Sequence, residues 1–258
     1  MINKNIKAKK SLGQNFLVDK NVINKILKIA NIENEDVIEI GPGQGALTTH
    51  LVNLANRVLA FEIDKDMIEI LNSSIINDNF TLVHQDFLET DLNFENKWAV
   101  VANLPYYITS KILFKIFENI NSFSKLTIMV QEEVADRIVA KVKTPSYGKL
   151  SISCQYLASV KKEFIVLPNS FVPKPKVNSA IVTFSFYPDL KQKEINLFLE
   201  FIKKCFSMKR KTLINNLKLF LDSNKIELIF NSLNLKLNIR PQEIDLISYK
   251  KMFKLLNN

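Results

Sequence analysis

Short apolar runs alternate with helical patterns between about residues 36 and 186. Seven runs rich in β-branched and aromatic residues are predicted as strands: 36–40, 57–63, 81–84, 98–102, 126–130, 162–167 and 178–186. Apolar residues recur at helical spacing in five segments between them: 46–55, 64–74, 109–118, 132–141 and 148–158. This alternation is typical of βαβ units. We therefore expect a doubly wound α/β fold whose sheet has about seven strands, with the last pair antiparallel.

Both ends of the chain depart from this pattern. After residue 189 only helical periods remain, with Ile195, Phe198 and Ile202 on one face. Residues 7–17 have no clear period and are predicted as an arm, followed by a helix that Asp19 caps. We therefore expect a larger domain at 1–188 that includes the arm, and a small all-α domain at 189–258.

The charge of the chain is concentrated near its end. The 258 residues include 35 basic and 26 acidic side chains, a net charge of +9, and residues 190–258 hold 14 of the basic and 6 of the acidic ones. The basic side chains of this tail could follow RNA phosphates, and the candidates are Lys203, Lys204, Lys209, Arg210 and Lys211. A solvated helix face is an equally good interpretation of the same residues.

Several classes of protein are disfavoured by composition. The chain has only 5 Gly and 8 Pro, its apolar runs are interrupted well before 18 residues, and it begins without an apolar signal region. The two cysteines, Cys154 and Cys205, lack C-x-x-C spacing, and the two histidines are isolated. We expect a monomeric cytoplasmic protein that binds no membrane and no metal.

A glycine-rich turn follows the first predicted strand of the sheet. The segment 39–48 reads Glu-Ile-Gly-Pro-Gly-Gln-Gly-Ala-Leu-Thr and leads into a predicted helix, the place where such sheets bind ligands. Glu62, at the end of the next strand, could accept both ribose hydroxyls, and Asp86 could accept an adenine amine. The glycine spacing is G-x-G-x-G, whereas NAD sites have G-x-G-x-x-G. The pattern favours S-adenosylmethionine, with Gly41, Gly43, Glu62 and Asp86 around it.

The fourth predicted strand ends in a polar, proline-containing turn, residues 103–106. Carbonyl oxygens of Asn103 and of the backbone near Leu104 could accept the protons of an exocyclic base amine, whose lone pair is otherwise delocalised into the ring. Pro105 fixes the turn, and Tyr106 offers a face for an extruded base. Phe171, in a proline-rich loop, could stack on the other face of the base, or it could pack on the core.

These segments resemble the ribosomal RNA adenine dimethyltransferase family over nearly the whole chain. The matching runs are 10–17, 39–48, 103–106, 171–180, 209–213 and 240–241. The resemblance implies a class I, Rossmann-like methyltransferase fold with a helical C-terminal domain and S-adenosylmethionine as methyl donor. It also implies that Asn15 and Leu17 of the arm line the cofactor together with Asn103. Tyr107 stands where many relatives have asparagine and is assigned no role.

Within the family the chain is most similar to the branch that dimethylates two adjacent adenosines in the terminal hairpin of small-subunit (16S) ribosomal RNA. Action late in assembly of the 30S subunit is implied by the same resemblance. Three other functions stay open: dimethylation of large-subunit RNA, a binding factor that monitors ribosome assembly, and a DNA adenine methyltransferase. The third is disfavoured because such enzymes commonly have a larger target-recognition region than this 69-residue tail.

Overall fold

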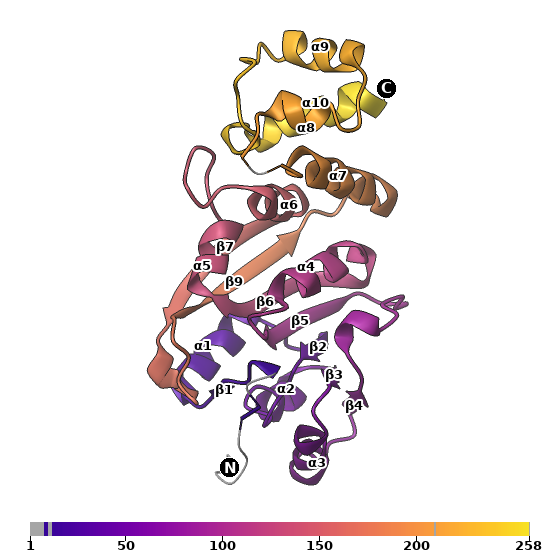
Figure 1. The fold of residues 1–258 in the computed structure, drawn as a ribbon. Helices are drawn as coiled ribbons and strands as arrows, with labels where there is room; N and C mark the ends of the chain where they lie inside the picture. The colour runs from indigo at the N-terminus through magenta and orange to yellow at the C-terminus, as the bar shows by residue number, and fades with distance from the viewer. Residues whose placement is uncertain (1–7, 10–11, 209, 258) are drawn as a thin grey trace. The chain divides into compact units, whose positions relative to one another are not determined.

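The protein is described by a computed structural model that covers residues 8–9, 12–208 and 210–257 (Figure 1). Its contacts divide the chain into two compact units, Met1–Ala135 with Lys161–Phe186, and Asp136–Val160 with Tyr187–Asn258. Segment 136–160, which the sequence analysis assigned to the first domain, is thus grouped with C-terminal residues. The division at residue 188 stays a prediction about which parts of the chain fold as domains.

A seven-stranded sheet forms the centre of the first unit, in the order β4-β3-β2-β5-β6-β9-β7. Its strands are β2 (Asp36–Ile40), β3 (Arg57–Glu62), β4 (Phe80–His84), β5 (Trp98–Asn103), β6 (Phe123–Gln131), β7 (Ala158–Val166) and β9 (Ser179–Phe186). The first five run parallel, and β9 pairs antiparallel with β6. Because parallel neighbours end at one edge, the carboxyl ends of β2 to β5 meet there. The predicted seven strands are confirmed.

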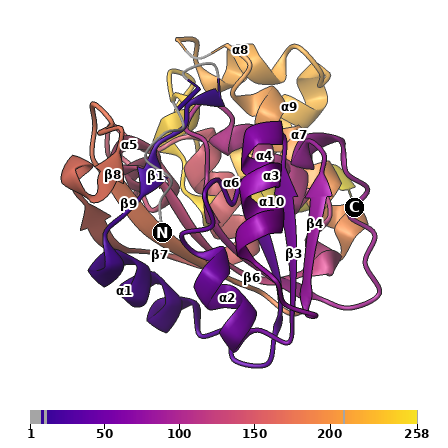
Figure 2. The same cartoon turned by 90° about the horizontal axis from the view of Figure 1, so that it is seen from below.

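Helices cover both faces of this sheet (Figure 2). Buried residues of α1 (Lys20–Ala30), α2 (Thr48–Leu54) and α3 (Lys65–Ser74) share one apolar cluster with Val37, Val101 and Ile181 of the sheet. On the other face, Phe117 of α4 (Thr109–Phe117) lies 6.2 Å from Phe184, ring centre to ring centre. Side chains alternate between the two faces of a sheet, and consecutive residues of the central strands are apolar. Both faces are therefore apolar and must be covered.

The predicted arm contains a strand that its sequence does not reveal. Strand β1 (Phe16–Leu17) pairs antiparallel with β8 (Phe171–Val172), so that Leu17 lies opposite Phe171. A two-residue strand is too short to show a period, and its partner is far away in the chain. Helix α1 begins after Asp19, whose side chain accepts hydrogen bonds from the N–H groups of Asn21 and Val22. The predicted cap is confirmed.

The second unit is helical and has an aromatic core. Its helices are α6 (Lys149–Leu157), α7 (Gln192–Cys205), α8 (Leu213–Leu217), α9 (Ser223–Ser232) and α10 (Leu246–Asn257), while α5 (Glu132–Ile138) crosses from one unit into the other. The ring of Tyr156 stacks on that of Phe198 at 3.7 Å, and Phe253 meets Phe198 edge-on at 5.4 Å. Such pairs stabilise a core beyond the area they bury. From residue 189 onward the described chain forms helices and turns, as predicted.

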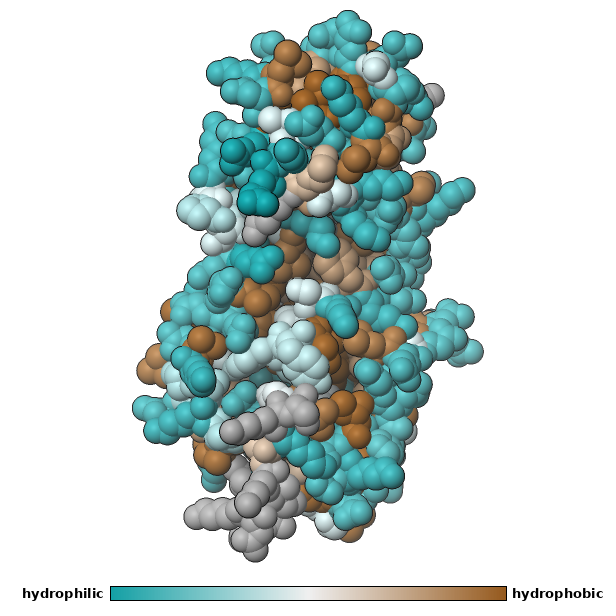
Figure 3. Space-filling view, viewed as in Figure 1, coloured by the Kyte–Doolittle hydropathy of each residue, from teal (hydrophilic) through white to brown (hydrophobic). Residues whose placement is uncertain are grey.

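Short 3-10 turns complete the secondary structure: Phe87–Glu89, Ile120–Ser122, Pro168–Ser170 and Pro241–Glu243. The face seen in Figure 3 is mostly hydrophilic, although hydrophobic residues also show there. Exposed apolar side chains of the second unit are Leu197, Leu219, Leu228, Leu237 and Ile247. Within the described ranges, no helix is both long and apolar enough to span a membrane.

Candidate functional site

A cavity opens in the first unit at the carboxyl edge of the parallel strands, with a volume of about 1080 Å³ including its mouth. Three parts of the chain line it: the arm, the turns after β2, β3 and β4, and the turn after β5. The cavity brings together the predicted residues Asn15, Leu17, Gly41, Gly43, Glu62, Asp86, Asn103, Leu104, Pro105 and Tyr106.

The turn after β2 has backbone angles that only glycine adopts easily. Gly41 and Gly43 have φ values of +68° and +56°. A Cβ atom added to Gly43 would lie 3.2 Å from the ring of Phe16 in the arm. The backbone conformation favours glycine at both positions, and at Gly43 the space for a side chain is also limited. Gly41 and Gly43 both line the cavity, and their contact with a ligand stays a prediction.

Glu62 is held at the end of β3 by three backbone N–H groups. Its Oε2 accepts from Gly43 at 3.0 Å, and its Oε1 accepts from Ile63 at 2.9 Å and from Asp64 at 3.0 Å. Burial raises the pKa of Glu62, and the backbone hydrogen bonds oppose this rise. The carboxylate is only 6% exposed and lines the cavity, so its orientation is set before any ligand arrives.

Glu39 is a second carboxyl group in the cavity wall, and the sequence analysis assigned it no role. It is 2% exposed, and no described residue hydrogen-bonds to its Oε2. Burial raises the pKa of Glu39 to about 8, and the charge of Glu62 adds to this rise. The Thr48 hydroxyl, which is itself buried, opposes the rise in the pKa of Glu39. The position of Glu39 two residues before Gly41 was the feature of the sequence that could have indicated a place in the cavity wall.

The third turn carries Asp86 and Phe87. Asp86 begins the short turn Phe87–Glu89, and its Oδ1 accepts from the Leu88 N–H at 2.9 Å. Phe87 is almost fully buried, and the ring of Phe61 meets it edge-on at 5.6 Å. Both residues line the cavity. A carboxylate and an aromatic residue thus line the cavity next to each other in the chain, and their role as an adenine pocket stays a prediction.

The turn after β5 is attached at both of its ends. The N–H of Leu104 donates to the Met129 carbonyl at 3.1 Å, which continues the sheet pairing. The carbonyl of Pro105 accepts from the Ile108 N–H and from the Thr109 hydroxyl at 3.3 Å and 3.1 Å. The turn is therefore a rigid platform rather than a loose loop.

Two side chains of this turn are oriented by partners elsewhere in the chain. The Asn103 amide donates from Nδ2 to the Asn15 carbonyl at 3.2 Å, which leaves its Oδ1 as the acceptor for another group. The Tyr106 hydroxyl and the Ser179 hydroxyl are 2.6 Å apart and share a hydrogen bond. Ser179 is fully buried at the start of β9. One end of the Tyr106 side chain is thus fixed while the residue lines the cavity.

Phe171 is the one proposed site residue of the first unit that does not line the cavity. It is fully buried in β8, in the same apolar cluster as Leu17 and Val166. Its ring has no exposed face for a base, so base stacking by Phe171 is not compatible with this structure. The alternative from the sequence, an aromatic side chain that packs on the core, describes its position. The loop motif alone could not distinguish these two positions.

The predicted RNA-binding residues belong to the second unit and are described there by themselves. Lys203 and Lys204 lie in the last turn of α7, where both approach Glu200, at 3.4 Å and 3.9 Å. Arg210 and Lys211 are exposed in the segment after α7, and Lys209 lies outside the described residues. Lys203 and Lys204 are also exposed, so the described side chains of this set are accessible.

The cavity also contains residues that motif analysis missed. Gln14 and Phe16 of the arm line it, and so does Tyr107, which is 57% exposed. A Cβ atom on Gly13 would lie 3.1 Å from the Tyr107 ring, so the ring packs directly against the arm. Elsewhere, Cys154 and Cys205 are buried free thiols. Among the described residues, no cluster of His, Cys, Asp and Glu could hold a metal ion.

Comparison with known proteins agrees with this geometry. A family model described as "Ribosomal RNA adenine dimethylase" matches residues 5–258. The chain belongs to this ribosomal RNA adenine dimethylase family. The resemblance found in the sequence motifs is thereby confirmed.

Named relatives support the same family. The chain is 53% identical over 249 residues to "Ribosomal RNA small subunit methyltransferase A" of Mycoplasma mobile, covering 96% of this chain and 98% of the relative. A relative of the same name from Mycoplasmopsis synoviae is 50% identical, with 97% of each chain covered. Identity at this level extends over both units of the dimethylase, including its helical tail.

Solved structures share the fold of this dimethylase. A dimethyladenosine transferase from Plasmodium falciparum matches with a TM-score of 0.80 and 26% identity, over 94% of this chain and 97% of the other. The 23S rRNA methyltransferase ErmE matches with a TM-score of 0.69 and 25% identity, over 95% and 100%. The predicted Rossmann-like class I methyltransferase fold with a helical C-terminal region is confirmed.

Proposed function

We propose that this dimethylase transfers methyl groups from S-adenosylmethionine to two adjacent adenosines in the 3'-terminal hairpin of small-subunit ribosomal RNA. Each adenosine receives two methyl groups on N6, late in assembly of the small subunit and in the cytoplasm. The observation that carries the proposal is that one cavity contains both a nucleoside-type wall around Glu62 and the Asn103–Tyr106 turn.

The residues of the cavity fit the cofactor. Glu62 is a pre-oriented carboxylate for ribose hydroxyls, and Asp86 beside Phe87 suits an adenine ring and its amine. The partnerless Oε2 of Glu39 would accept from a donor group of the same molecule. Gly41, Gly43, Asn15 and Leu17 complete the set of residues that would hold it. When bound, S-adenosylmethionine supplies a methyl group on a positively charged sulfur.

The Asn103–Tyr106 turn would orient the adenine amine. Its lone pair is delocalised into the ring, so the amine is a poor nucleophile until its protons are held. Oδ1 of Asn103 and a backbone carbonyl near Leu104 would accept the two N–H groups and direct the lone pair into the cavity. The Tyr106 ring would support the extruded base. These residues act by orientation and charge placement, which contribute much of the rate in many enzymes.

The choice of the small subunit rests on the relatives. Proteins that are 50% and 53% identical over almost the whole chain are named for small-subunit RNA, whereas the 23S rRNA methyltransferase ErmE is 25% identical. Exposed basic side chains of the second unit, including Arg210 and Lys211, would contact RNA phosphates. Such contacts add affinity without selecting a sequence.

The test uses small-subunit particles that lack the two dimethylations. Purified protein is incubated with these particles and labelled S-adenosylmethionine, and methylated nucleotides are mapped by mass. We expect two methyl groups on each of two adjacent adenosines of the terminal hairpin, and no label on large-subunit particles in parallel. Label on large-subunit RNA alone would favour the ErmE-like alternative. Absence of label on both substrates would contradict the proposed activity.

A further inference from the structure

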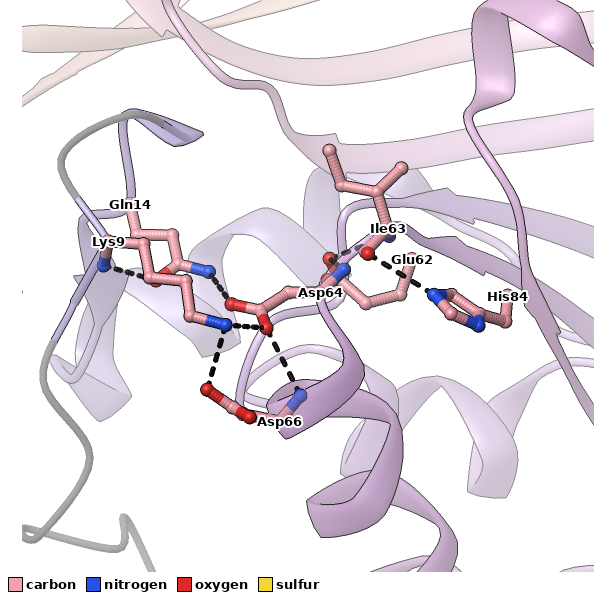
Figure 4. A network of polar contacts seen from close by, with 7 residues as sticks. All are labelled: Lys9, Gln14, Glu62, Ile63, Asp64, Asp66 and His84. Atoms are coloured by element: carbon pink, nitrogen blue, oxygen red, sulfur yellow. Dashed lines mark hydrogen bonds and ion pairs between the residues drawn. The ribbon is translucent and has the colours of Figure 1, made fainter.

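The N-terminal arm is tied to the sheet edge by a buried carboxylate, Asp64, and Lys9 of the arm also pairs with Asp66 at 2.8 Å (Figure 4). The Lys9 ammonium lies 2.5 Å from Asp64 Oδ1, and the Gln14 amide donates from Nε2 to Oδ2 at 2.7 Å. The Asp64 side chain has no exposed surface. We call Lys9, Gln14 and Asp64 the arm clasp. It joins residues that are 50 or more positions apart in the sequence.

The clasp is also cross-linked within itself. The Gln14 side chain accepts from the Lys9 backbone N–H at 2.8 Å, so its amide is bound at both ends. Burial alone would raise the pKa of Asp64, but the hydrogen bonds from Lys9 and Gln14 outweigh it and keep that pKa below its usual value. The carboxylate is therefore ionised and matched by its partners. A paired buried charge of this kind constrains geometry more than it stabilises the fold.

The position of the clasp links it to the cavity. Asp64 follows Glu62 by two residues, and its own N–H is one of the donors that hold Glu62 Oε1. On the arm, the segment that follows Lys9 supplies residues 12–17 of the cavity wall. This wall is also attached at the Asn15 carbonyl, which accepts from Asn103, and by the pairing of β1 with β8. The arm thus reaches from the Glu62 side of the cavity to the Asn103 side.

We propose that Asp64 is a positioning residue: by holding Lys9 and Gln14 it keeps the arm over the cavity and sets how slowly the cofactor dissociates. The inference rests on the proposed function, because it requires that the cavity takes S-adenosylmethionine. With the clasp open, residues 12–17 lose their anchor beside Glu62, and a bound cofactor loses one wall. The effect falls on cofactor binding, since the backbone of the Asn103–Tyr106 turn and the Tyr106 hydroxyl have attachments at Met129 and Ser179. Asn15, which holds the Asn103 amide, stays next to the β1–β8 pairing.

The decisive variant is Asp64→Asn. Asp64 also caps α3, where its side chain accepts from the Asp66 N–H, and asparagine is an equally good cap. With its oxygen kept at the Oδ1 position, asparagine still accepts from the Asp66 N–H, but it turns an amide toward Gln14 Nε2 and removes the nearer of the two charges that face Lys9. The pair of Lys9 with Asp66 at 2.8 Å remains. The variant Lys9→Met opens the clasp from the arm side and leaves the Asp64 and Gln14 side chains in place.

Cofactor binding and catalysis are measured separately. Affinity for S-adenosylhomocysteine comes from titration calorimetry, its dissociation rate from displacement, and kcat from assays at saturating S-adenosylmethionine. We expect Asp64→Asn to raise Kd about tenfold through faster dissociation, because loss of one hydrogen bond to a charged group typically changes an equilibrium constant by about that factor. The value of kcat should stay within about twofold. Lys9→Met should behave in the same way, and Lys9→Arg should retain most of the affinity.

The matched control is Asp36→Asn, which breaks a comparable ion pair with Arg57 at the start of β2. It should leave Kd unchanged. If Asp64→Asn lowers the melting temperature as Asp36→Asn does and leaves Kd unchanged, the clasp only stabilises the fold and the inference is wrong. Glu62→Gln separates the two proposals. If it too leaves Kd unchanged, the cavity is not the cofactor site, and the proposed function fails with the inference.

Discussion

Two walls of the same cavity differ in chemistry. The wall at β2 and β3 carries the buried carboxyl groups of Glu39 and Glu62, and burial raises the pKa of both. The wall after β5 presents the neutral side chains of Asn103 and Tyr106. Acidic acceptors suit the hydroxyl and amine donors of a cofactor that must be retained. Neutral acceptors suit the amine of the substrate adenine, which must stay unprotonated to react. The first wall should therefore control cofactor affinity and the second the rate of methyl transfer.

The largest expected effect tests the second wall. Asn103→Ala removes the Oδ1 acceptor and should lower kcat at saturating cofactor by about 100-fold or more, as loss of one pre-oriented polar group commonly does. Cofactor Kd should change much less. Asn103→Asp keeps an acceptor oxygen and should retain more activity than the alanine variant. Steady-state assays on unmethylated particles measure both, and a variant Asn103→Ala with more than a tenth of normal kcat would contradict the assignment.

Glu62→Gln tests the first wall. An amide has one acceptor oxygen where the carboxylate has two, so it cannot serve Gly43, Ile63 and Asp64 together with the ribose hydroxyls. We expect Kd for S-adenosylhomocysteine to rise by about 10- to 30-fold, from the usual value of hydrogen bonds to charged groups. At saturating cofactor, kcat should fall by less than about threefold. An equal fall in kcat would show that the two walls do not divide the work.

A smaller effect is expected where the second wall is attached to β9. Tyr106→Phe and Ser179→Ala each remove the shared hydrogen bond and keep the aromatic ring. Each should lower kcat by about fivefold, near the net value of one hydrogen bond. Because both changes remove the same contact, the double variant should be no slower than either single one. Additive losses in this double-mutant cycle would mean that the two hydroxyl groups act independently.

The smallest effect is on stability and concerns Glu39. The pKa of Glu39 is about 8 in the folded protein and near its usual value of 4.5 in the unfolded chain. Between pH 4.5 and pH 8, folding is therefore coupled to the uptake of a proton by Glu39. The stabilisation is complete below pH 4.5 and is lost as the pH rises to about 8. Glutamine does not titrate. The melting temperature of Glu39→Gln minus that of the natural protein should therefore increase by about 3 °C or more when the pH is raised from 5 to 9. If the difference in melting temperature is the same at pH 5 and at pH 9, Glu39 is already ionised in the folded protein at pH 5.

Most of the sheet and its ligand edge could be predicted from local pattern. The predicted strand at 36–40 coincides with β2, and the strand predicted at 98–102 ends one residue before β5 does. The alternation of strands and helices decides that these strands are parallel, and parallel strands place Glu62, Asp86 and Asn103 at one edge. The glycine turn was equally visible, since positive φ angles favour glycine.

The remaining features depend on contacts between distant residues. Pairing of β1 with β8, the Asp64 clasp and the shared hydrogen bond of Tyr106 and Ser179 each join residues more than 40 positions apart. No local period reports such contacts. Phe171 shows the limit clearly, because its motif suits both a base platform and a core position, and only burial distinguishes them.

By itself, the sequence determined the order of strands and helices, the cap at Asp19 and the residue types at the carboxyl edge, because periodicity and turn chemistry are local. Only the tertiary structure decided which carboxyl group lost its solvent, which side chain entered the core and which residues hold the arm. Those outcomes depend on burial and on charges brought together across the fold, and neither is written in the spacing of residues along the chain.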